Sequence, residues 1–271
     1  MTPFSRLLTT TLTALAVCAV APTFAGAEDG ADQDGLQIGH DCYGLPTHHD
    51  LQTALNSARA QSNGGFDLDM WGTVVNRDGI VCAVAFTGAN RGSQWPGSRV
   101  ISAQKANTAN AFSLPKLALS TADLYAAVQP GGTLYGLQHS NPVSTSVAYR
   151  GPATSFGSSN DPMVGSRIGG VNVFGGGLAL YDHKGVLVGG LGVSGDTSCA
   201  DHNISWRTRH NLNLDFVPGG VSTNGDDNIN YIGEVPNPSL AHDFSHPICK
   251  IAGVDTVSAI SHSLPPIQKV Q

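Results

Sequence analysis

Glycine is concentrated in one part of this 271-residue sequence, and this concentration constrains the fold more than any other feature. Sixteen of the 33 glycines lie between Gly131 and Gly195. Glycine weakens helix and strand interiors, but it permits left-handed turns, bulges and the close approach of another backbone or a ligand. The glycines follow no Gly-X-Y period, which excludes a collagen-like helix. We therefore expect this region to form short strands and tight turns.

Charged residues are few. Asp, Glu, Lys and Arg make up 13% of the chain, against about 25% in typical soluble proteins, and the net charge is −6. The absence of a Lys/Arg cluster argues against a nucleic-acid-binding protein. A hydrophobic content of 41% is too high for a disordered chain. We expect a folded core beneath a surface made polar mainly by Gly, Asn, Ser and Thr.

The first residues have the pattern of a targeting segment. Arg6 gives a positive start, residues 7–20 are mainly apolar, and Ala25-Gly26-Ala27 fits a small-residue cleavage site. The apolar run is too short for a transmembrane span. Residues 1–27 are therefore predicted to be a signal peptide, and the protein to be secreted or periplasmic. Lipidation at Cys18 is the alternative, although the residue before it is bulkier than usual.

Four cysteines remain after the predicted leader is removed. In an oxidising compartment they favour two disulfides, for which three connectivities exist. We favour Cys42–Cys82 and Cys199–Cys249, because each bond would join a terminal extension to the central region. Buried free thiols are the alternative. No C-x-x-C pair is present, so a zinc site is not expected.

Hydrophobic periodicity predicts an α+β fold, with helices packed on an antiparallel sheet. Four helices are predicted. The first begins after the N-cap Thr47, the second and third span Arg99–Phe112 and Thr121–Val128, and the fourth runs from the Gly195-Asp196-Thr197 cap to about His210. The predicted strands are Trp71–Val75, Ile80–Phe86, Gly170–Phe174, Leu178–Tyr181 and Val186–Val193. Gly, Asn and Asp in the intervening turns favour hairpins.

The same patterns divide the chain after the leader into three parts, the second of which contains an insertion. Residues 28–46 form a polar N-terminal arm, and residues 47–210 contain the periodic elements. Residues 143–166 are rich in Ser, Gly and Pro, which predicts a surface insertion in that domain. Residues 211–271 form an irregular C-terminal extension with little periodicity.

Four motifs resemble one known family when they are taken together and in order. They are ISAQKANTA at 101–109, QPGGTLYGL at 129–137, VFGGGLAL at 173–180 and VGGLGVSG at 188–195. They are similar to the GlcG/HbpS-like haem-degrading, haem-binding domain family over about residues 47–210. The resemblance implies a PAS- or profilin-like α+β fold, homo-oligomers, and binding of haem or a related tetrapyrrole. It implies no single reaction.

Two features of these motifs are candidate binding groups. Gly175, Gly176 and Gly177 form a loop close to where the family places a ligand, and their alternative role is turn geometry. Lys105 lies mid-helix in the first motif, where it could neutralise a propionate or act as a base if buried. A solvated lysine is the alternative interpretation.

Histidine is the expected ligand for a haem iron. His202 is the first candidate for this metal because it lies near the start of the helix that follows Gly195. His139, which follows the Gly131-Gly132 loop, is the second candidate. Structural hydrogen bonding is the alternative for both. His242 and His246 have a metal-clasp spacing, but a segment flanked by prolines does not favour the helix that a clasp requires.

Two functions follow from these observations. The first is an exported haem-binding protein for uptake, storage or sensing, acting with a sensor or receptor protein. The second is an enzyme that degrades haem or acts on another small molecule in the same pocket. No G-x-S-x-G motif is present and no catalytic residue is assigned. A disulfide-bonded oligomeric domain without a cofactor is the third interpretation.

Overall fold

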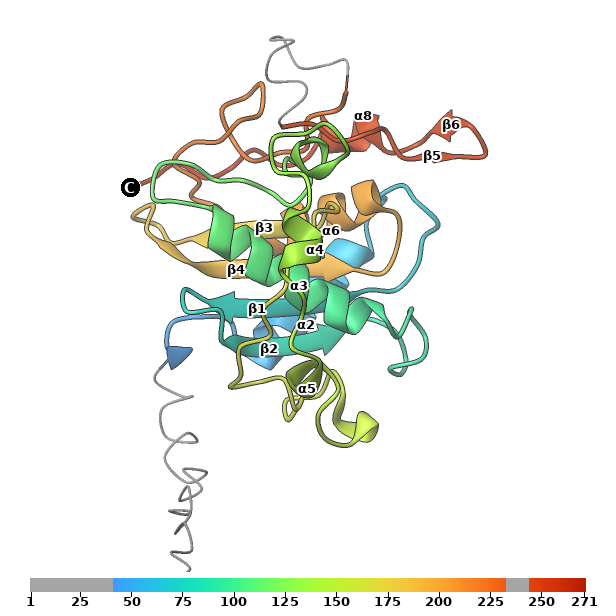
Figure 1. Ribbon diagram of the computed structural model, residues 1–271, viewed down its shortest axis with the longest axis vertical. Coiled ribbons are helices and arrows are strands. Elements are labelled where there is room, and N and C mark those ends of the chain that lie inside the picture. The colour runs from blue at the N-terminus through green and yellow to red at the C-terminus, as the bar shows by residue number, and fades with distance from the viewer. Residues whose placement is uncertain (1–40, 233–243) are drawn as a thin grey trace, which may run out of the picture.

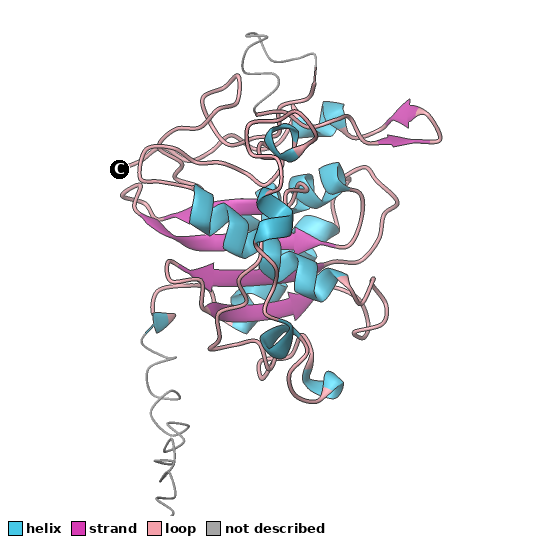
Figure 2. Ribbon diagram, viewed as in Figure 1, coloured by secondary structure: helices cyan, strands magenta, loops and turns pink. Residues whose placement is uncertain are grey.

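A four-stranded antiparallel sheet forms the centre of the protein (Figures 1 and 2). The computed structural model describes residues 41–232 and 244–271. The predicted signal peptide and most of the predicted arm lie outside the described residues. The strand order is β2-β1-β4-β3. The strands span Trp71–Asn76 (β1), Val81–Phe86 (β2), Gly177–Tyr181 (β3) and Leu187–Ser194 (β4).

The sheet consists of two hairpins joined through their inner strands. β1 pairs with β4 from Trp71 opposite Ser194 to Asn76 opposite Gly189. The turn of the first hairpin is set locally, because the Asn76 side chain accepts hydrogen bonds from the backbone N–H groups of Asp78 and Ile80, each at 2.9 Å. Both predicted hairpins are present.

Helices cover both faces of this sheet, which confirms the predicted α+β class. α3 (Ser98–Phe112) packs on one face, while α2 (His48–Arg59) and α6 (Ser198–Asn211) pack side by side on the other (Figure 1). The shorter elements are α4 (Leu137–Ser140), α5 (Thr145–Ala148), α8 (Ser258–Ser261), the 3-10 turns η2 (Ala126–Val128) and η3 (Ala153–Ser155), and the small hairpin β5 (Lys250–Ile251) and β6 (Val254–Asp255).

The start of α2 follows the predicted capping pattern. The Thr47 side chain accepts a hydrogen bond from the Asp50 backbone, and the Asp50 carboxylate accepts one from the Thr47 backbone at 3.0 Å. This reciprocal arrangement satisfies two N–H groups that the helix itself leaves unpaired. The apolar stripe that includes Leu51 and Leu55 is buried, so this helix is confirmed.

The clustered glycines allow α3 to lie very close to β4. A Cβ atom placed on Gly190 would lie 2.3 Å from the carbonyl oxygen of Ala106, and one on Gly192 would lie 1.9 Å from that of Ser102. Neither distance is tolerable for a methyl group. The glycine content of the fourth motif is therefore a requirement of helix–sheet packing.

We expect Gly192→Ala to lower the free energy of unfolding by about 1–3 kcal/mol, because α3 must move away from the sheet to admit the methyl group. Chemical denaturation followed by circular dichroism measures the change. Gly97→Ala is the matched control, since a Cβ at Gly97 would meet no atom within 4 Å. Equal stability of the two variants would contradict the packing argument.

Two predicted elements were wrong. Residues 121–128 contain only the 3-10 turn η2, since the backbone N–H of Ala126 donates to Ser245 of the C-terminal extension. Residues 170–174 form no strand, because three of their backbone N–H groups donate to side chains. The N–H of Asn172 donates to Thr108 Oγ1, that of Val173 to Gln138 Oε1, and that of Phe174 to Asn172 Oδ1. In both segments, hydrogen bonds to residues distant in sequence replace those of the predicted helix or strand.

Residues 143–166, predicted to be a surface insertion, are anchored to the core. The carboxylate of Asp161 forms an ion pair with Arg99 of α3, and both side chains are buried. Ala148 and Met163 pack into the cluster that contains Trp71 and Val100. The segment therefore covers the N-terminal end of α3, while its remaining residues stay at the surface.

Both favoured disulfides are present. Cys42–Cys82 joins the start of the described chain to β2, and Cys199–Cys249 joins α6 to the C-terminal extension. The extension also packs on α6 through a buried cluster that contains Tyr231 and Val257. Within the two described ranges, no helix has the length and apolar character that a membrane span requires.

Candidate functional site

Lys105 lies in the buried layer between α3, β4 and α6. Its ammonium group donates to Oδ2 of Asp201 at 2.8 Å and to the carbonyl oxygen of Val193 at 3.0 Å. The other carboxylate oxygen of Asp201 accepts hydrogen bonds from the backbone N–H groups of Gly195 and Asp196. The solvated-lysine interpretation is therefore wrong. A propionate could reach this ammonium only if the pair opened.

Burial shifts the pKa values of both Lys105 and Asp201. Desolvation lowers the pKa of Lys105, and the charge of Asp201 opposes that change. Desolvation also raises the pKa of Asp201 to about 6, against the lowering effect of Lys105. The side chains of both residues are nearly inaccessible to solvent. The pair therefore holds three elements together and has no open face toward a substrate.

The glycine loop at residues 175–177 is packed against neighbouring chain segments. A Cβ atom at any of the three positions would lie 2.3–2.4 Å from an atom of another segment. The Gly175 N–H donates to Ser198 Oγ at 2.6 Å, and the Gly177 N–H donates to Thr121 Oγ1 at 2.8 Å. These glycines permit close approach, as predicted, but the approaching groups belong to the protein itself.

His202 is fully buried inside this layer. Its Nε2 lies 3.1 Å from both Oδ1 of Asn228 and the backbone nitrogen of Ile229. Its Nδ1 has no hydrogen-bond partner among the described residues. Burial lowers the pKa of the imidazole to about 4, so the ring is neutral at physiological pH. The ligand role of His202 stays a prediction, and an iron could reach this ring only after residues 228–229 moved.

His139 is exposed at the end of α4, in front of α3 in Figure 1. No hydrogen bond or ion pair occupies its imidazole among the described residues. It borders a pocket of about 310 Å³. The lining combines aromatic, apolar and amide side chains: Tyr125, Val128, Gln129, Pro130, Tyr135, Gly136, Gln138, His139, Val173 and Phe174.

The structure thus separates the predicted site residues into two groups. Lys105, the glycine loop and His202 come together, since a Cβ on Gly176 would lie 3.2 Å from Lys105 Nζ and one on Gly175 would lie 3.1 Å from His202 Cβ. His139 lies on the surface pocket instead. The two groups are linked through residues 173–177, which line the pocket at one end and close over α6 at the other.

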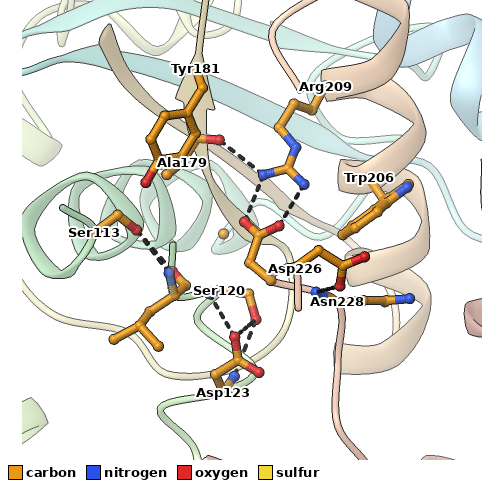
Figure 3. A network of polar contacts seen from close by, with 12 residues as sticks. Ser113, Ser120, Asp123, Ala179, Tyr181, Trp206, Arg209, Asp226 and Asn228 are labelled. Carbon is orange, nitrogen blue, oxygen red and sulfur yellow. Dashed lines mark hydrogen bonds and ion pairs between the residues drawn. The ribbon is translucent and has the colours of Figure 1, made fainter. Parts of the chain in front are cut away.

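A buried network of charged and polar groups was not predicted from the sequence (Figure 3). The Arg209 guanidinium forms two hydrogen bonds with the Asp227 carboxylate, at 2.6 and 2.8 Å, and a third with the carbonyl oxygen of Ala179. Nearby, Asp123 bonds to Ser120, and burial raises the pKa of Asp123 well above its usual range. This network joins α6 to the C-terminal extension.

A second unpredicted cluster surrounds His246, which is buried. Ser198 Oγ lies 2.8 Å from Nε2 of His246, and the other ring nitrogen lies 2.6 Å from the Pro247 carbonyl oxygen. The ring also packs on Tyr125, with centroids 4.8 Å apart. His246 lies on an isolated bridge with Tyr231 and outside any helix, while His242 lies outside the described residues.

A larger pocket of about 550 Å³ lies between α3 and residues 149–156. Its lining includes Trp71, Tyr149 and Phe156. The guanidinium of Arg99 stacks on Phe156 at 3.7 Å but is already paired with Asp161. Among the described residues no His, Cys or Met lines this pocket, and Tyr149 is its one side chain of a type that ligates haem iron.

Comparisons with known proteins give a family match. The model of the family described as haem degrading protein HbpS-like matches residues 47–208. A crystal structure of a PduOC:heme complex is 24% identical, with 61% of this chain and 91% of that chain covered and a TM-score of 0.43. The Klebsiella pneumoniae protein ORFY is 21% identical, and the match covers 60% of this chain and 86% of ORFY with a TM-score of 0.41. HbpS is 16% identical, and the match covers 60% of this chain and 84% of HbpS with a TM-score of 0.37. No curated protein matches the chain.

Proposed function

The chain belongs to the HbpS-like family of haem degrading proteins, and we propose that it binds haem in the pocket beside His139. The observation that carries this proposal is the combination of the family match with an exposed imidazole to which none of the described residues bonds. A neutral imidazole is the most common protein ligand of haem iron. The described residues hold no comparable arrangement in the larger pocket.

The lining of the His139 pocket fits a flat tetrapyrrole. Tyr125, Tyr135 and Phe174 provide aromatic surface, and the side chains of Tyr135 and Phe174 are 62% and 42% exposed. Stacking on such rings stabilises planar ligands. No Lys or Arg of the described ranges lines the pocket, so the propionates are expected to stay in water.

The size of the pocket suggests that the haem is only partly covered by one chain. A volume of about 310 Å³ lies at the lower end of the range of about 300–1,000 Å³ that is usual for ligand pockets. The outer face of the ligand would then lie against solvent or a second copy of the chain. This supports the homo-oligomer that we propose alongside haem binding.

We further propose that the protein acts outside the cytoplasm, in haem uptake, storage or sensing through a partner protein. The N-terminal pattern and the two disulfides support export, since disulfides persist in oxidising compartments. The family description favours a second function, degradation of the bound haem. Bound haem would then lose its absorbance with a reductant or peroxide faster than free hemin does.

A hemin titration of the purified chain tests the binding site, with size-exclusion chromatography run beside it. We expect a Soret band, and we expect His139→Ala to weaken hemin binding at least tenfold, or about 1.4 kcal/mol, because the iron loses its protein ligand. His183→Ala is the control, since His183 is exposed on the β3–β4 turn. A folded His202→Gln variant that loses the band while His139→Ala keeps it would place the iron at His202 instead.

A further inference from the structure

The Cys199–Cys249 disulfide lies directly beside His246. Nδ1 of His246 is 3.9 Å from Sγ of Cys199, and the three side-chain ligand atoms all lie within 4.8 Å of one another. This is the one group of three or more His, Cys, Asp or Glu side chains in the described ranges that is close enough to hold a metal ion. Two of the three residues are buried and Cys249 is partly buried.

We propose that reduction of the Cys199–Cys249 disulfide creates a zinc site whose ligands are Cys199, Cys249 and His246. Two thiolates and one imidazole form a ligand set that binds Zn²⁺ and leaves a fourth position for water or another ligand. The oxidised form has no free thiolate and cannot bind the ion in this way. The redox state of one disulfide therefore determines whether the site exists.

The atoms need to move little to reach zinc geometry. With Zn–S bonds of about 2.3 Å and a Zn–N bond of about 2.0 Å, a tetrahedral site places its sulfurs about 3.8 Å apart and each sulfur about 3.5 Å from the nitrogen. The Cys199 sulfur already lies 3.9 Å from the nitrogen. Once their bond is broken the two sulfurs have to separate, and all three ligand atoms already lie within 4.8 Å of one another.

The surroundings of His246 suit a metal ligand. A coordinating imidazole usually donates its second N–H to an acceptor that fixes the ring, and Ser198 Oγ lies 2.8 Å from Nε2. The ring is also held by its packing on Tyr125. In the oxidised form Nδ1 instead contacts the Pro247 carbonyl oxygen, which the metal would replace as its partner.

The chemistry requires a thiol reductant. Two reductant thiols become one disulfide, and the protein disulfide takes up their two hydrogens to give two cysteine thiols. Zn²⁺ then displaces the two thiol protons. The imidazole keeps its single proton, which moves from Nδ1 to Nε2 as the metal binds. No other oxidant or reductant is needed.

The position of the disulfide determines which sulfur is attacked. Cys249 is the partly exposed member, whereas Cys199 is buried in the first turn of α6. Attack on the Cys249 sulfur releases the Cys199 thiolate beside the N-terminal end of the helix. The sulfur of Cys249 is therefore the one that a thiol reductant can reach, and Cys199 is the leaving sulfur.

Zinc binding to the reduced chain tests the proposal, and the other disulfide gives a matched control. A Cys42→Ser/Cys82→Ser variant keeps only the proposed site, and after reduction it should bind one Zn²⁺ per chain in competition with a chromogenic chelator. Without reduction it should bind none. A Cys199→Ser/Cys249→Ser variant, reduced in the same way, should bind at least a hundredfold more weakly. Equal binding by the two reduced variants, or no binding by the first, would overturn the proposal.

A third variant excludes unspecific binding by an unfolded reduced chain. His246→Gln, made in the Cys42→Ser/Cys82→Ser background, should bind zinc at least tenfold more weakly. With Co²⁺ as a spectroscopic probe, it should show altered d–d bands while it keeps the thiolate charge-transfer band. Unchanged affinity and unchanged bands would mean that the thiols alone bind the metal, which also overturns the proposal. The result is independent of hemin binding, since the haem proposal rests on His139.

Discussion

Asp227→Asn is expected to lower the free energy of unfolding by about 3–5 kcal/mol, because it leaves the buried Arg209 guanidinium without its hydrogen-bonded carboxylate. Both side chains of this ion pair are fully buried. The guanidinium lies beside Trp206 on one side, and its Nε already has no hydrogen-bond partner among the described residues. Water therefore cannot easily replace the lost carboxylate.

Urea denaturation of the wild-type protein and the variant measures this loss. Asp67→Asn is the matched control, because it removes one carboxylate from the Arg59–Asp67 ion pair, in which the Asp67 side chain is 85% exposed. We expect the control to cost no more than about 1 kcal/mol. A similar loss in both variants would show that burial does not determine the contribution of the Arg209–Asp227 pair.

This ion pair also shows what the sequence could not reveal. Arg209 and Asp227 are 18 residues apart, and Asp227 lies in an extension with no periodic pattern. One signal was present in α6 itself. The helix carries buried Asp201, His202 and Ser205 where an amphipathic helix would place apolar side chains. A buried helix of this composition requires polar partners elsewhere in the chain, and the C-terminal extension supplies them.

Local patterns, in contrast, were sufficient for much of the fold. The capping box at Thr47, the Asn76 turn and the strand pairing of β3 with β4 depend on residues near one another in sequence. Residues 121–128 and 170–174 were assigned wrongly because distant groups compete for their backbone. The same reasoning explains why His246 was overlooked as a partner of Cys199. Their contact spans 47 residues, and no local spacing marks it.

The candidate site was predictable only in part. The motifs identified the segments that meet around α6, but not that Lys105 and the glycine loop would be buried by the protein itself. A family motif indicates which residues lie close together, and accessibility depends on the C-terminal extension that packs above them. Asn228 and Ile229, which close over His202, belong to that extension. His139 remains accessible because α4 lies at the surface.

Acid is expected to destabilise the protein through His202. Burial lowers the pKa of this imidazole from 6.5 to about 4 in the folded state. The charge of Asp227 and the hydrogen bond with Asn228 raise this pKa, whereas the charges of Arg209 and His246 lower it further. Between these two pH values the unfolded chain binds a proton that the folded chain does not. Stability from this group is therefore complete above pH 6.5 and is lost as the pH falls toward 4. The shift corresponds to about 3 kcal/mol at the lower limit.

A His202→Gln variant isolates this contribution, because glutamine keeps a polar side chain at the position but does not titrate. The measurement is the urea midpoint of both proteins at several pH values from 7 to 4. His246, whose pKa is also lowered to about 4, gives a loss in the same direction, and Asp201, whose pKa is raised to about 6, gives the opposite slope. Both groups remain in the variant, so the difference between the two curves reports His202 together with its coupling to His246. The wild-type protein should lose stability relative to the variant as the pH falls below about 6.5. Parallel curves would contradict the prediction, because they would mean that the ring has the same pKa in the folded and unfolded states.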